Sequence, residues 1–384
     1  MKTVCENGRC TSCMLCQDIC PKGAIKIIDS LSQYDAVIDK EKCIQCGKCY
    51  RVCQNNKLPE LHMPIYWKEG WSLNEELRKI SASGGLATEI EKKFVKNGGV
   101  VSSCVFEKGD FSFQIAETED DVEKFKGSKY VKSNAKGVYR NVYDLLKVGK
   151  RVLFVGLPCQ VAALKKYLGN NERLYTIDLI CHGAPSVQIL NSYIKDKNMN
   201  LKKIKDIYFR TKSTFVLTKN SKTFTVPFAS ENYSTAFGRA AIFAESCYRC
   251  HYAQIKRGSD ITLGDSWGTE QSYEEQIKGI SLVLCQTEKG KHLLENCNIK
   301  LLDVDLERCI QYNHQLNYPS QAPNERHILM RELKKGKSFE QAFRKSYPKE
   351  YIKDEVKKML YKLGVYNKEV KDIIYHLVVS ETNL

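Results

Sequence analysis

The stretch CTSCMLCQDICP, residues 10–21, places four cysteines in the spacing C-x2-C-x2-C-x3-C and follows them with a proline. The stretch CIQCGKCYRVC, residues 43–53, repeats the same spacing. Between the two stretches, AIKIIDS (24–30) and YDAVIDK (34–40) are short runs rich in apolar and β-branched residues, which predict a hairpin. The start of the chain is therefore predicted to consist of two similar cysteine loops joined by two strands.

Three closely spaced thiolates can bind three corners of a [4Fe-4S] cluster, and in tandem loops of this kind the fourth ligand comes from the other loop. The spacing thus predicts two clusters and a domain over residues 1–58 whose folding depends on the metal. A pair of zinc sites is the alternative, because zinc also binds C-x2-C pairs. The predicted ligands are Cys10, Cys13, Cys16 and Cys53 for the first cluster, and Cys43, Cys46, Cys49 and Cys20 for the second.

Residues 5–55 resemble the bacterial two-cluster ferredoxins in the number, order and spacing of these cysteines. One departure from the pattern is Gln54, which stands where the first loop has Pro21. We expect this change to alter the packing over the second cluster. Cys5 lies outside the repeated spacing, and the sequence predicts no role for it.

The composition of the whole chain indicates a protein of the cytoplasm. Its 384 residues suffice for a second, larger domain. The N-terminus MKTVCENGRC lacks an apolar signal segment, and no window approaches the 18 apolar residues of a membrane span. In a reducing compartment, clustered cysteines hold metal more often than they form disulfides.

A formal charge of +15 raises the question of nucleic-acid binding. The lysines are spread along the chain and interleaved with acids, as in KDEVKKMLYKLG (353–364), which is typical of a solvated surface. No nucleic-acid-binding motif is present, so we expect no nucleic-acid partner. A basic face that docks an acidic electron carrier is the alternative.

After a predicted linker over residues 59–78, the chain begins to alternate helices and strands. Small residues at 81–85 (SASGG) precede an apolar pattern with helical spacing from Leu86 to Phe94, and the strand VVSSCVF (100–106) follows. Small residues at a helix N-terminus leave backbone N–H groups free to bind an anion, such as the phosphate of a nucleotide cofactor. An ordinary serine cap with a glycine turn is the alternative.

Two successive segments, 151–169 and 174–194, each predict a buried strand, a turn and a helix. Cys159 follows the first strand and Cys181 follows the second. Open α/β sheets bind their ligands beyond the carboxyl ends of such strands. The two cysteines are therefore expected to face one crevice.

A third segment, ESCYRCHYAQIKRGSDITLGDSWG (245–268), adds Cys247 and Cys250 ahead of a predicted strand. Together with Cys159 and Cys181, this pair can bind one further cluster. The alternatives are that the first two cysteines are small buried residues, and that the C-x2-C pair binds zinc with His251. The unpaired cysteines predicted to be core residues are Cys104, Cys285, Cys297 and Cys309.

Six motifs that follow one another between residues 81 and 268 identify a family. SASGG, GSKYVKS, GLPCQVAAL, ICHGAPS, CYRC and ITLGDSWG resemble the beta-subunit family of coenzyme F420-reducing hydrogenases and F420-dependent dehydrogenases. The resemblance covers about residues 75–310. It implies that FAD, rather than FMN, exchanges a hydride with a two-electron partner such as coenzyme F420.

The resemblance also implies where the cofactors bind. It assigns a third [4Fe-4S] cluster to Cys159, Cys181, Cys247 and Cys250. The residues that it places at the flavin are Ser81, Ser83, Gly84, Gly85, Gly127, Ser128, Lys129 and Tyr130. His182 and Asp265 are candidates for orienting the flavin or relaying a proton, or are simply hydrogen-bonding groups at strand ends.

An enzyme that joins iron–sulfur clusters to hydride chemistry needs a carrier that exchanges electrons both singly and in pairs, and a flavin does so. The sequence therefore predicts an oxidoreductase that works between a ferredoxin, or another redox protein, and a two-electron substrate. Coenzyme F420, NAD(P)H and a small organic acceptor are the candidate substrates. The alternatives are an electron-transfer subunit without its own substrate and a zinc-stabilised module without redox function.

The predicted fold class is α/β in four parts. A two-cluster ferredoxin-type domain (1–58) and a linker (59–78) precede a mixed-sheet flavin and iron–sulfur domain (79–310). A helical C-terminal region (311–384) follows, which we interpret as surface helices. The sequence leaves the oligomeric state open.

Overall fold

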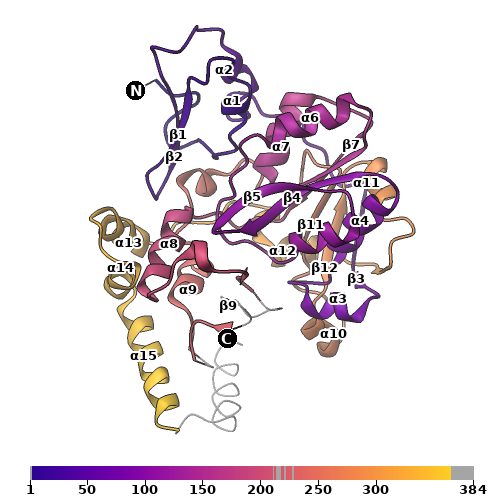
Figure 1. Ribbon diagram of the computed structural model, residues 1–384. Helices are drawn as coiled ribbons and strands as arrows, with labels where there is room; N and C mark the ends of the chain where they lie inside the picture. The colour runs from indigo at the N-terminus through magenta and orange to yellow at the C-terminus, as the bar shows by residue number, and fades with distance from the viewer. Residues whose placement is uncertain (1, 211, 213–217, 220–221, 227–228, 365–384) are drawn as a thin grey trace.

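An eight-stranded mixed sheet in the order β13-β3-β12-β11-β7-β6-β4-β5 forms the centre of the body (Figure 1). Strands β4, β6, β7 and β11 are parallel neighbours, and antiparallel strands extend the sheet on both sides. The structure, a computed structural model, describes residues 2–210, 212, 218–219, 222–226 and 229–364. The strands of the sheet are β3 (Tyr66–Ser72), β4 (Val100–Glu107), β5 (Asp110–Ala116), β6 (Val152–Val155), β7 (Leu174–Leu179), β11 (Ile261–Asp265), β12 (Ser281–Cys285) and β13 (Ile299–Leu302). The predicted mixed α/β fold is confirmed.

The parallel strands are buried on both faces because helices cover them. All four residues of β6 are buried, as its continuous apolar run predicts. Helix α4 (Leu86–Lys96) begins after Gly85, whose left-handed φ of 86° turns the chain into the helix. Helix α7 (Pro158–Leu168) begins with its proline, which the first turn of a helix tolerates. The other helices beside the sheet are α3 (Glu75–Ile80), α5 (Glu119–Val122), α6 (Val138–Lys147), α10 (Tyr273–Lys278), α11 (Glu288–Leu293) and α12 (Leu306–Tyr312).

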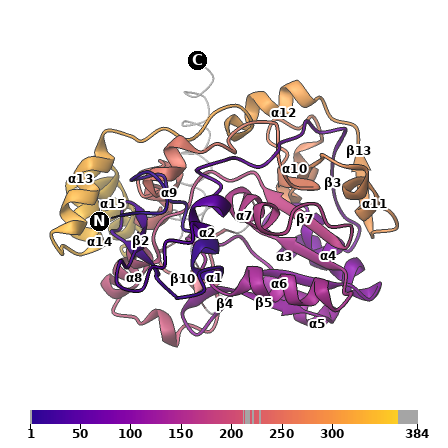
Figure 2. The ribbon, with the colours of Figure 1, turned by 90° about the horizontal axis from the view of Figure 1, so that it is seen from above.

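The N-terminal domain lies next to α6 and α7, and Figure 2 shows it from above. Its strands β1 (Ile25–Asp29) and β2 (Tyr34–Ile38) form the predicted antiparallel hairpin. Two short helices, α1 (Leu15–Asp18) and α2 (Lys48–Val52), lie within the two cysteine loops and carry their third cysteines, Cys16 and Cys49. This domain is thus made of cysteine loops around a single hairpin.

Residues 59–78, predicted to be a linker, contain β3 and the start of α3. Strand β3 pairs with both β12 and β13 and therefore belongs to the central sheet. Its sequence looks like that of an exposed segment because Glu69 interrupts the aromatic residues. Glu69 is buried and accepts hydrogen bonds from three side chains of the loop after β11, including Ser266 at 2.6 Å. Glu69 therefore makes the segment look exposed in the sequence, although the folded protein buries this carboxyl group and supplies its hydrogen bonds.

The C-terminal region contributes to the core as well as to the surface. Its helices are α13 (Glu325–Lys334), α14 (Phe339–Ser346) and α15 (Pro348–Lys362). Leu329, Phe339 and Phe343 are fully buried in an apolar cluster shared with α8 (Val187–Asp196) and α9 (Asn232–Gly238). The interpretation as surface helices therefore holds for only part of the region, and residues 365–384 lie outside the described residues.

Three short strands, β8 (Ile207–Tyr208), β9 (Thr218–Lys219) and β10 (Lys222–Thr223), form a small separate sheet. Within the described ranges, no helix combines the length and the apolar character that crossing a lipid bilayer requires.

Candidate iron–sulfur and cofactor site

The two cysteine loops of the N-terminal domain share one backbone shape. The second residue after the first cysteine is left-handed in both loops, with φ of 53° at Ser12 and 54° at Gln45. The residue after the second cysteine is left-handed too, with φ of 67° at Met14 and 69° at Gly47. Because non-glycine residues adopt this conformation rarely, the agreement shows that the sequence repeat is also a structural repeat.

The first cysteine group combines the first loop with Cys53 from the end of the second. Burial raises the pKa of the Cys13 thiol to about 12, and the nearby Cys10 and Cys53 act in the same direction. Buried thiolates this close repel one another, and metal binding compensates for that repulsion. Cys5 lies beside the group, where hydrogen bonds with Cys10 and Cys53 raise the pKa of the Cys5 thiol far above its usual value.

The second group combines the second loop with Cys20. A cavity of about 30 Å³ is lined by all four of its cysteines. Burial raises the pKa of Cys49, and Cys20, Cys43 and Cys46 raise it further. The backbone N–H of Ala24 points at the Cys20 sulfur, 3.2 Å away, as donors do around iron–sulfur ligands. Cys20 thus lies with the second loop and Cys53 with the first, and their exchange as cluster ligands stays a prediction.

The third group brings together cysteines from three segments of the body. Burial raises the pKa of Cys181, and Cys247, Cys159 and Cys250 contribute to the same shift. The backbone N–H of Ala184 lies 3.5 Å from the Cys247 sulfur. For the part of the chain that the structure describes, no three His, Cys, Asp or Glu side chains are arranged for a single metal ion. A [4Fe-4S] cluster, by contrast, binds its four thiolates at four separate iron atoms.

Gln54 connects the first cysteine group to the third. Its side chain is fully buried, and Nε2 donates hydrogen bonds to Thr11 Oγ1 at 2.9 Å and to the carbonyl oxygen of Cys159 at 3.2 Å. The hydroxyl of Tyr252 donates to Gln54 Oε1. The expectation that Gln54 alters packing over the second cluster is therefore wrong. Glutamine replaces proline here because the position docks the N-terminal domain onto the body.

Other contacts hold the same two domains together. The Asp18 carboxylate accepts a hydrogen bond of 2.7 Å from the backbone N–H of Gly137 at the start of α6. The Tyr139 hydroxyl donates to the carbonyl oxygen of Cys13 at 2.8 Å. Ser186, which caps α8, donates to the carboxylate of Asp29 at 2.6 Å. These bonds fix the first cysteine group relative to the third.

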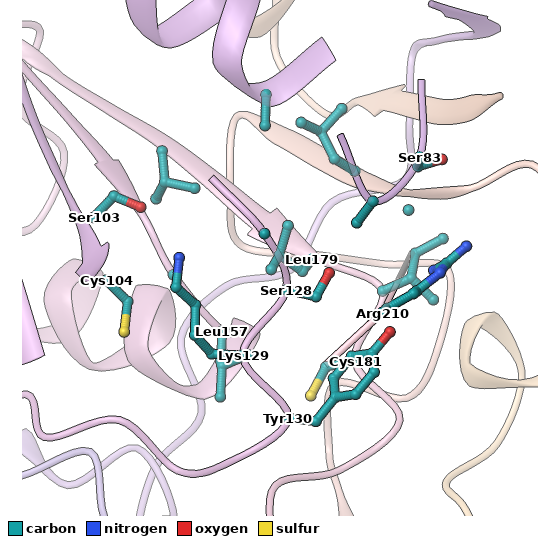
Figure 3. A pocket seen from close by; sticks show the side chains of 18 of the residues that line it. Ser83, Ser103, Cys104, Ser128, Lys129, Tyr130, Leu157, Leu179, Cys181 and Arg210 are labelled. Carbon is teal, nitrogen blue, oxygen red and sulfur yellow. The ribbon is translucent and has the colours of Figure 1, made fainter. Parts of the chain in front are cut away.

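A cavity of about 290 Å³ adjoins the third cysteine group, and Figure 3 shows side chains that line it. It lies beyond the carboxyl ends of β6, β7 and β11, where the sequence predicts a ligand crevice. The predicted site residues in its wall are Ser81, Ser83, Gly85, Gly127, Ser128, Lys129, Tyr130, Cys181, His182 and Asp265.

Gly84 is the predicted flavin residue that does not line this cavity. Its backbone N–H donates to Ser281 Oγ at 3.0 Å, and a Cβ atom there would lie 2.5 Å from the carbonyl oxygen of Gly70. Gly84 therefore allows the SASGG turn to pack closely against β3 and β12.

The cavity wall contains a buried acid, Glu91, and a half-buried lysine, Lys129. Burial raises the pKa of Glu91 to about 8, while the nearby Lys129 opposes the shift. Burial lowers the pKa of Lys129, whose ammonium donates to the carbonyl oxygens of Phe125 and Lys126. Sequence reasoning missed Glu91 because its position in α4 looks like part of the polar face of an amphipathic helix. Cys104 lines the cavity as well and is half-buried against an apolar core cluster, whereas Cys285 and Cys309 are fully buried.

Arg210 and Asp265 form a bidentate ion pair in the cavity wall. The guanidinium nitrogens lie 2.5 and 2.9 Å from the two carboxylate oxygens. The guanidinium also lies over the ring of Trp267, 5.5 Å from its centre. Asp265 thus orients the guanidinium of Arg210. Arg210 belongs to none of the sequence motifs, so the sequence alone does not identify it as a site residue.

His182 lines the cavity next to Cys181. Burial lowers the pKa of His182 to about 4, and His314 adds to the effect. Its Nδ1 lies 2.7 Å from Nε2 of Gln315. The imidazole is therefore neutral near pH 7 and serves as a hydrogen-bonding group. His251 lies elsewhere, near Arg9, which with burial lowers its pKa.

Comparison with known proteins places this arrangement in a class. The sequence model of the 4Fe-4S dicluster domain matches residues 9–57, the two cysteine loops and their hairpin. The protein is accordingly an iron–sulfur protein of the electron-transfer class. Two further models describe the N-terminal and C-terminal parts of the coenzyme F420 hydrogenase/dehydrogenase beta subunit, and they match residues 68–138 and 149–305. The chain belongs to that family, as its six motifs predict.

Individual relatives share parts of this organisation. One of the subunits of the F(420)H(2) dehydrogenase from Methanosarcina mazei is 24% identical over 298 residues, which cover 69% of this chain and 79% of the relative. The coenzyme F420-dependent sulfite reductase of Methanocaldococcus jannaschii is 23% identical over 177 residues, 43% of this chain and 26% of that protein. One of the subunits of an ion-translocating oxidoreductase complex from Methanosarcina acetivorans is 43% identical over 53 residues, 14% of this chain and 18% of the relative.

A solved structure also resembles the chain. A chain of the F420-reducing [NiFe] hydrogenase complex from Methanosarcina barkeri superposes with a TM-score of 0.47 and 19% identity. The match covers 69% of this chain and 98% of the other.

Proposed function

We propose that this protein is a flavin- and iron–sulfur-dependent oxidoreductase that exchanges electrons between a ferredoxin-type carrier and a two-electron substrate. One observation carries the proposal: Cys181 belongs both to the third cysteine group and to the wall of the 290 Å³ cavity. A cluster and a flavin bound at these places are direct neighbours. When bound, the clusters supply one-electron transfer and the flavin supplies two-electron exchange.

The donor sets fit three [4Fe-4S] clusters. Each of the three groups contains four thiols that are close enough to shift one another's pKa. The first cysteine group lies between the second and the third. Cys49 of the second group raises the pKa of Cys16, and Cys159 of the third group raises the pKa of Cys13. The two groups of the N-terminal domain and the third group of the body therefore form a continuous series of candidate cluster sites that ends at the cavity.

The cavity fits the flavin of the family. It has apolar walls, the hydroxyls of Ser83 and Ser128 (Figure 3), and a cation at Arg210. Helix α4 begins at Gly85 without a side-chain cap, which leaves its first N–H groups to bind a phosphate. We assign FAD, rather than FMN, on the resemblance to the family alone.

Reduced coenzyme F420 is the first substrate to assay, because the family description and two relatives name that coenzyme. NAD(P)H and small organic acceptors are the other candidates. An electron-transfer subunit without its own substrate is the second candidate function. It is favoured by the relative that is named as a subunit of a dehydrogenase.

Anaerobic purification with iron, zinc and flavin measured per chain tests the proposal. We expect about twelve iron atoms, one flavin and little zinc. Eight irons with one zinc would contradict the body cluster, and no flavin would contradict the enzyme. Oxidation of reduced F420 or NAD(P)H by the isolated chain with a dye acceptor would favour the enzyme over the subunit.

A pair of variants locates the body cluster. Cys159→Ala should lose about four irons and keep the two N-terminal clusters. Cys297→Ala, a partly buried cysteine packed against an apolar core, is the matched control and should keep all twelve. Equal iron contents in the two variants would show that the ligand assignment is wrong.

A further inference from the structure

Lys132 places a positive charge inside the series of cysteine groups. Its side chain belongs to the GSKYVKS motif but is not among the predicted flavin residues. The residue is 8% exposed, and its ammonium lies 3.5 Å from the sulfur of Cys159. The motif marks this lysine in the sequence, but only the structure shows that it is buried among cysteines.

The surroundings of the ammonium are thiols. The four side chains with the largest electrostatic effect on Lys132 are Cys159, Cys247, Cys13 and Cys181. Three of these belong to the third group and one to the first. A buried cation is costly unless a negative partner compensates for it. Here the thiolates of a bound cluster are that partner.

The backbone holds Lys132 in this place. Its N–H donates to the carbonyl oxygen of Pro185 at 2.8 Å, in the loop that follows Cys181. The neighbouring residues Val131 and Ser133 are buried as well. The ammonium is therefore fixed relative to the thiols of Cys159 and Cys181.

We propose that Lys132 raises the reduction potential of the cluster held by Cys159, Cys181, Cys247 and Cys250, an inference that rests on the proposed third cluster. One electron that leaves the cluster of Cys10, Cys13, Cys16 and Cys53 adds one negative charge at the body cluster. The ammonium stabilises that added charge, and no proton is needed to balance it. Lys132 thereby favours electron flow from the N-terminal domain toward the cavity.

The test compares three variants of the full chain by anaerobic redox titration followed by electron paramagnetic resonance. Lys132→Met removes the charge and keeps the length, Lys132→Arg keeps the charge, and Lys136→Met changes an exposed lysine nearby. The body cluster signal is the one that Cys159→Ala lacks. Iron content is measured on every sample.

In Lys132→Met with full iron, we expect the reduction equilibrium of the body cluster to become at least tenfold less favourable. That change corresponds to a midpoint about 59 mV lower for a one-electron couple. Lys132→Arg should recover most of the shift, and Lys136→Met should match the unmodified chain. An unshifted midpoint in Lys132→Met with full iron would overturn the proposal.

Two controls separate the possible failures. If the unmodified chain holds only eight irons, the third cluster of the proposed function is wrong, and the inference about Lys132 fails with it. If Lys132→Met loses iron, Lys132→Gln is titrated in its place, because an amide can still donate to the Cys159 sulfur without charge. An unshifted midpoint in that variant would also overturn the proposal.

Discussion

The hydrogen bonds of Gln54 allow a quantitative test of how the N-terminal domain docks onto the body. Gln54→Leu keeps the side-chain volume almost unchanged but removes both the donor and the acceptor. The carbonyl oxygen of Cys159, the hydroxyl of Tyr252 and the hydroxyl of Thr11 then lose their partner at a fully buried position. Leaving a buried polar group unsatisfied costs about 1–3 kcal/mol.

Some of these groups will find other partners, so we expect a total loss of about 2–4 kcal/mol of stability. For a domain of about 150–250 residues, 1 kcal/mol lowers the midpoint of thermal unfolding by about 2–4 °C. The expected decrease for Gln54→Leu is therefore about 4–16 °C. Anaerobic calorimetry of the cluster-loaded chain measures it directly. Gln114→Ala, which loses a single exposed hydrogen bond, is the matched control and should change the midpoint little.

A double-mutant cycle with Tyr252→Phe sharpens the test. The Tyr252→Phe variant has no hydroxyl that could lose its hydrogen-bond partner. Gln54→Leu should therefore lower the stability by about 1 kcal/mol less in this variant than in the unmodified chain. Strict additivity of the two substitutions, or a Gln54→Leu midpoint equal to that of the control, would refute the docking role of Gln54.

Three further substitutions test the cavity and its support. Burial raises the pKa of Glu91 to about 8 from an ordinary value of 4.5, so the stability of the protein should fall by up to about 1.4 kcal/mol per pH unit as the pH rises from 4.5 to 8. Glu91→Gln should flatten this decline in calorimetry, and an unchanged slope would contradict the buried acid. Asp265→Asn removes the charge partner of the nearly buried Arg210, so it should lower the free energy of unfolding by about 3 kcal/mol and reduce the flavin retained on gel filtration. Unchanged stability and flavin content would show that the ion pair is dispensable. Gly84→Ala places a Cβ 2.5 Å from a backbone oxygen of β3 and should lower the stability by about 1–3 kcal/mol. Gly238→Ala, whose Cβ meets nothing within 4 Å, is the control and should change the stability little. Equal midpoints of thermal unfolding for the two variants would contradict the tight turn at Gly84.

The sequence predicts best what depends on local spacing. The three thiols of each cysteine loop lie within seven residues, so their grouping follows from the chain itself, and the exchange of Cys20 and Cys53 follows from the repeat. The four cysteines of the body come from three distant segments. Spacing alone leaves their grouping open, and the resemblance to the family is needed to propose it.

The residues that sequence reasoning missed acquire their roles only through long-range packing. Glu91 and Lys132 look like ordinary charged residues of a helix and a loop until other segments bury them. Glu69 makes β3 look like part of a linker because its hydrogen-bonding partners lie about 200 residues further along the chain. Gln54 stands out in the sequence as a departure from the repeat, but only its contacts with Cys159 and Tyr252 of the body explain it.

In the proposed function, a cluster held by the body cysteines adjoins a flavin in the cavity. Crystals of the chain grown without oxygen, with anomalous diffraction recorded at the iron and zinc absorption edges, test it most directly. We expect three iron peaks, one of them among Cys159, Cys181, Cys247 and Cys250, and flavin density against Cys181 and Ser128. A zinc peak at the body cysteines, or two iron peaks with an empty cavity in a flavin-loaded preparation, would contradict it.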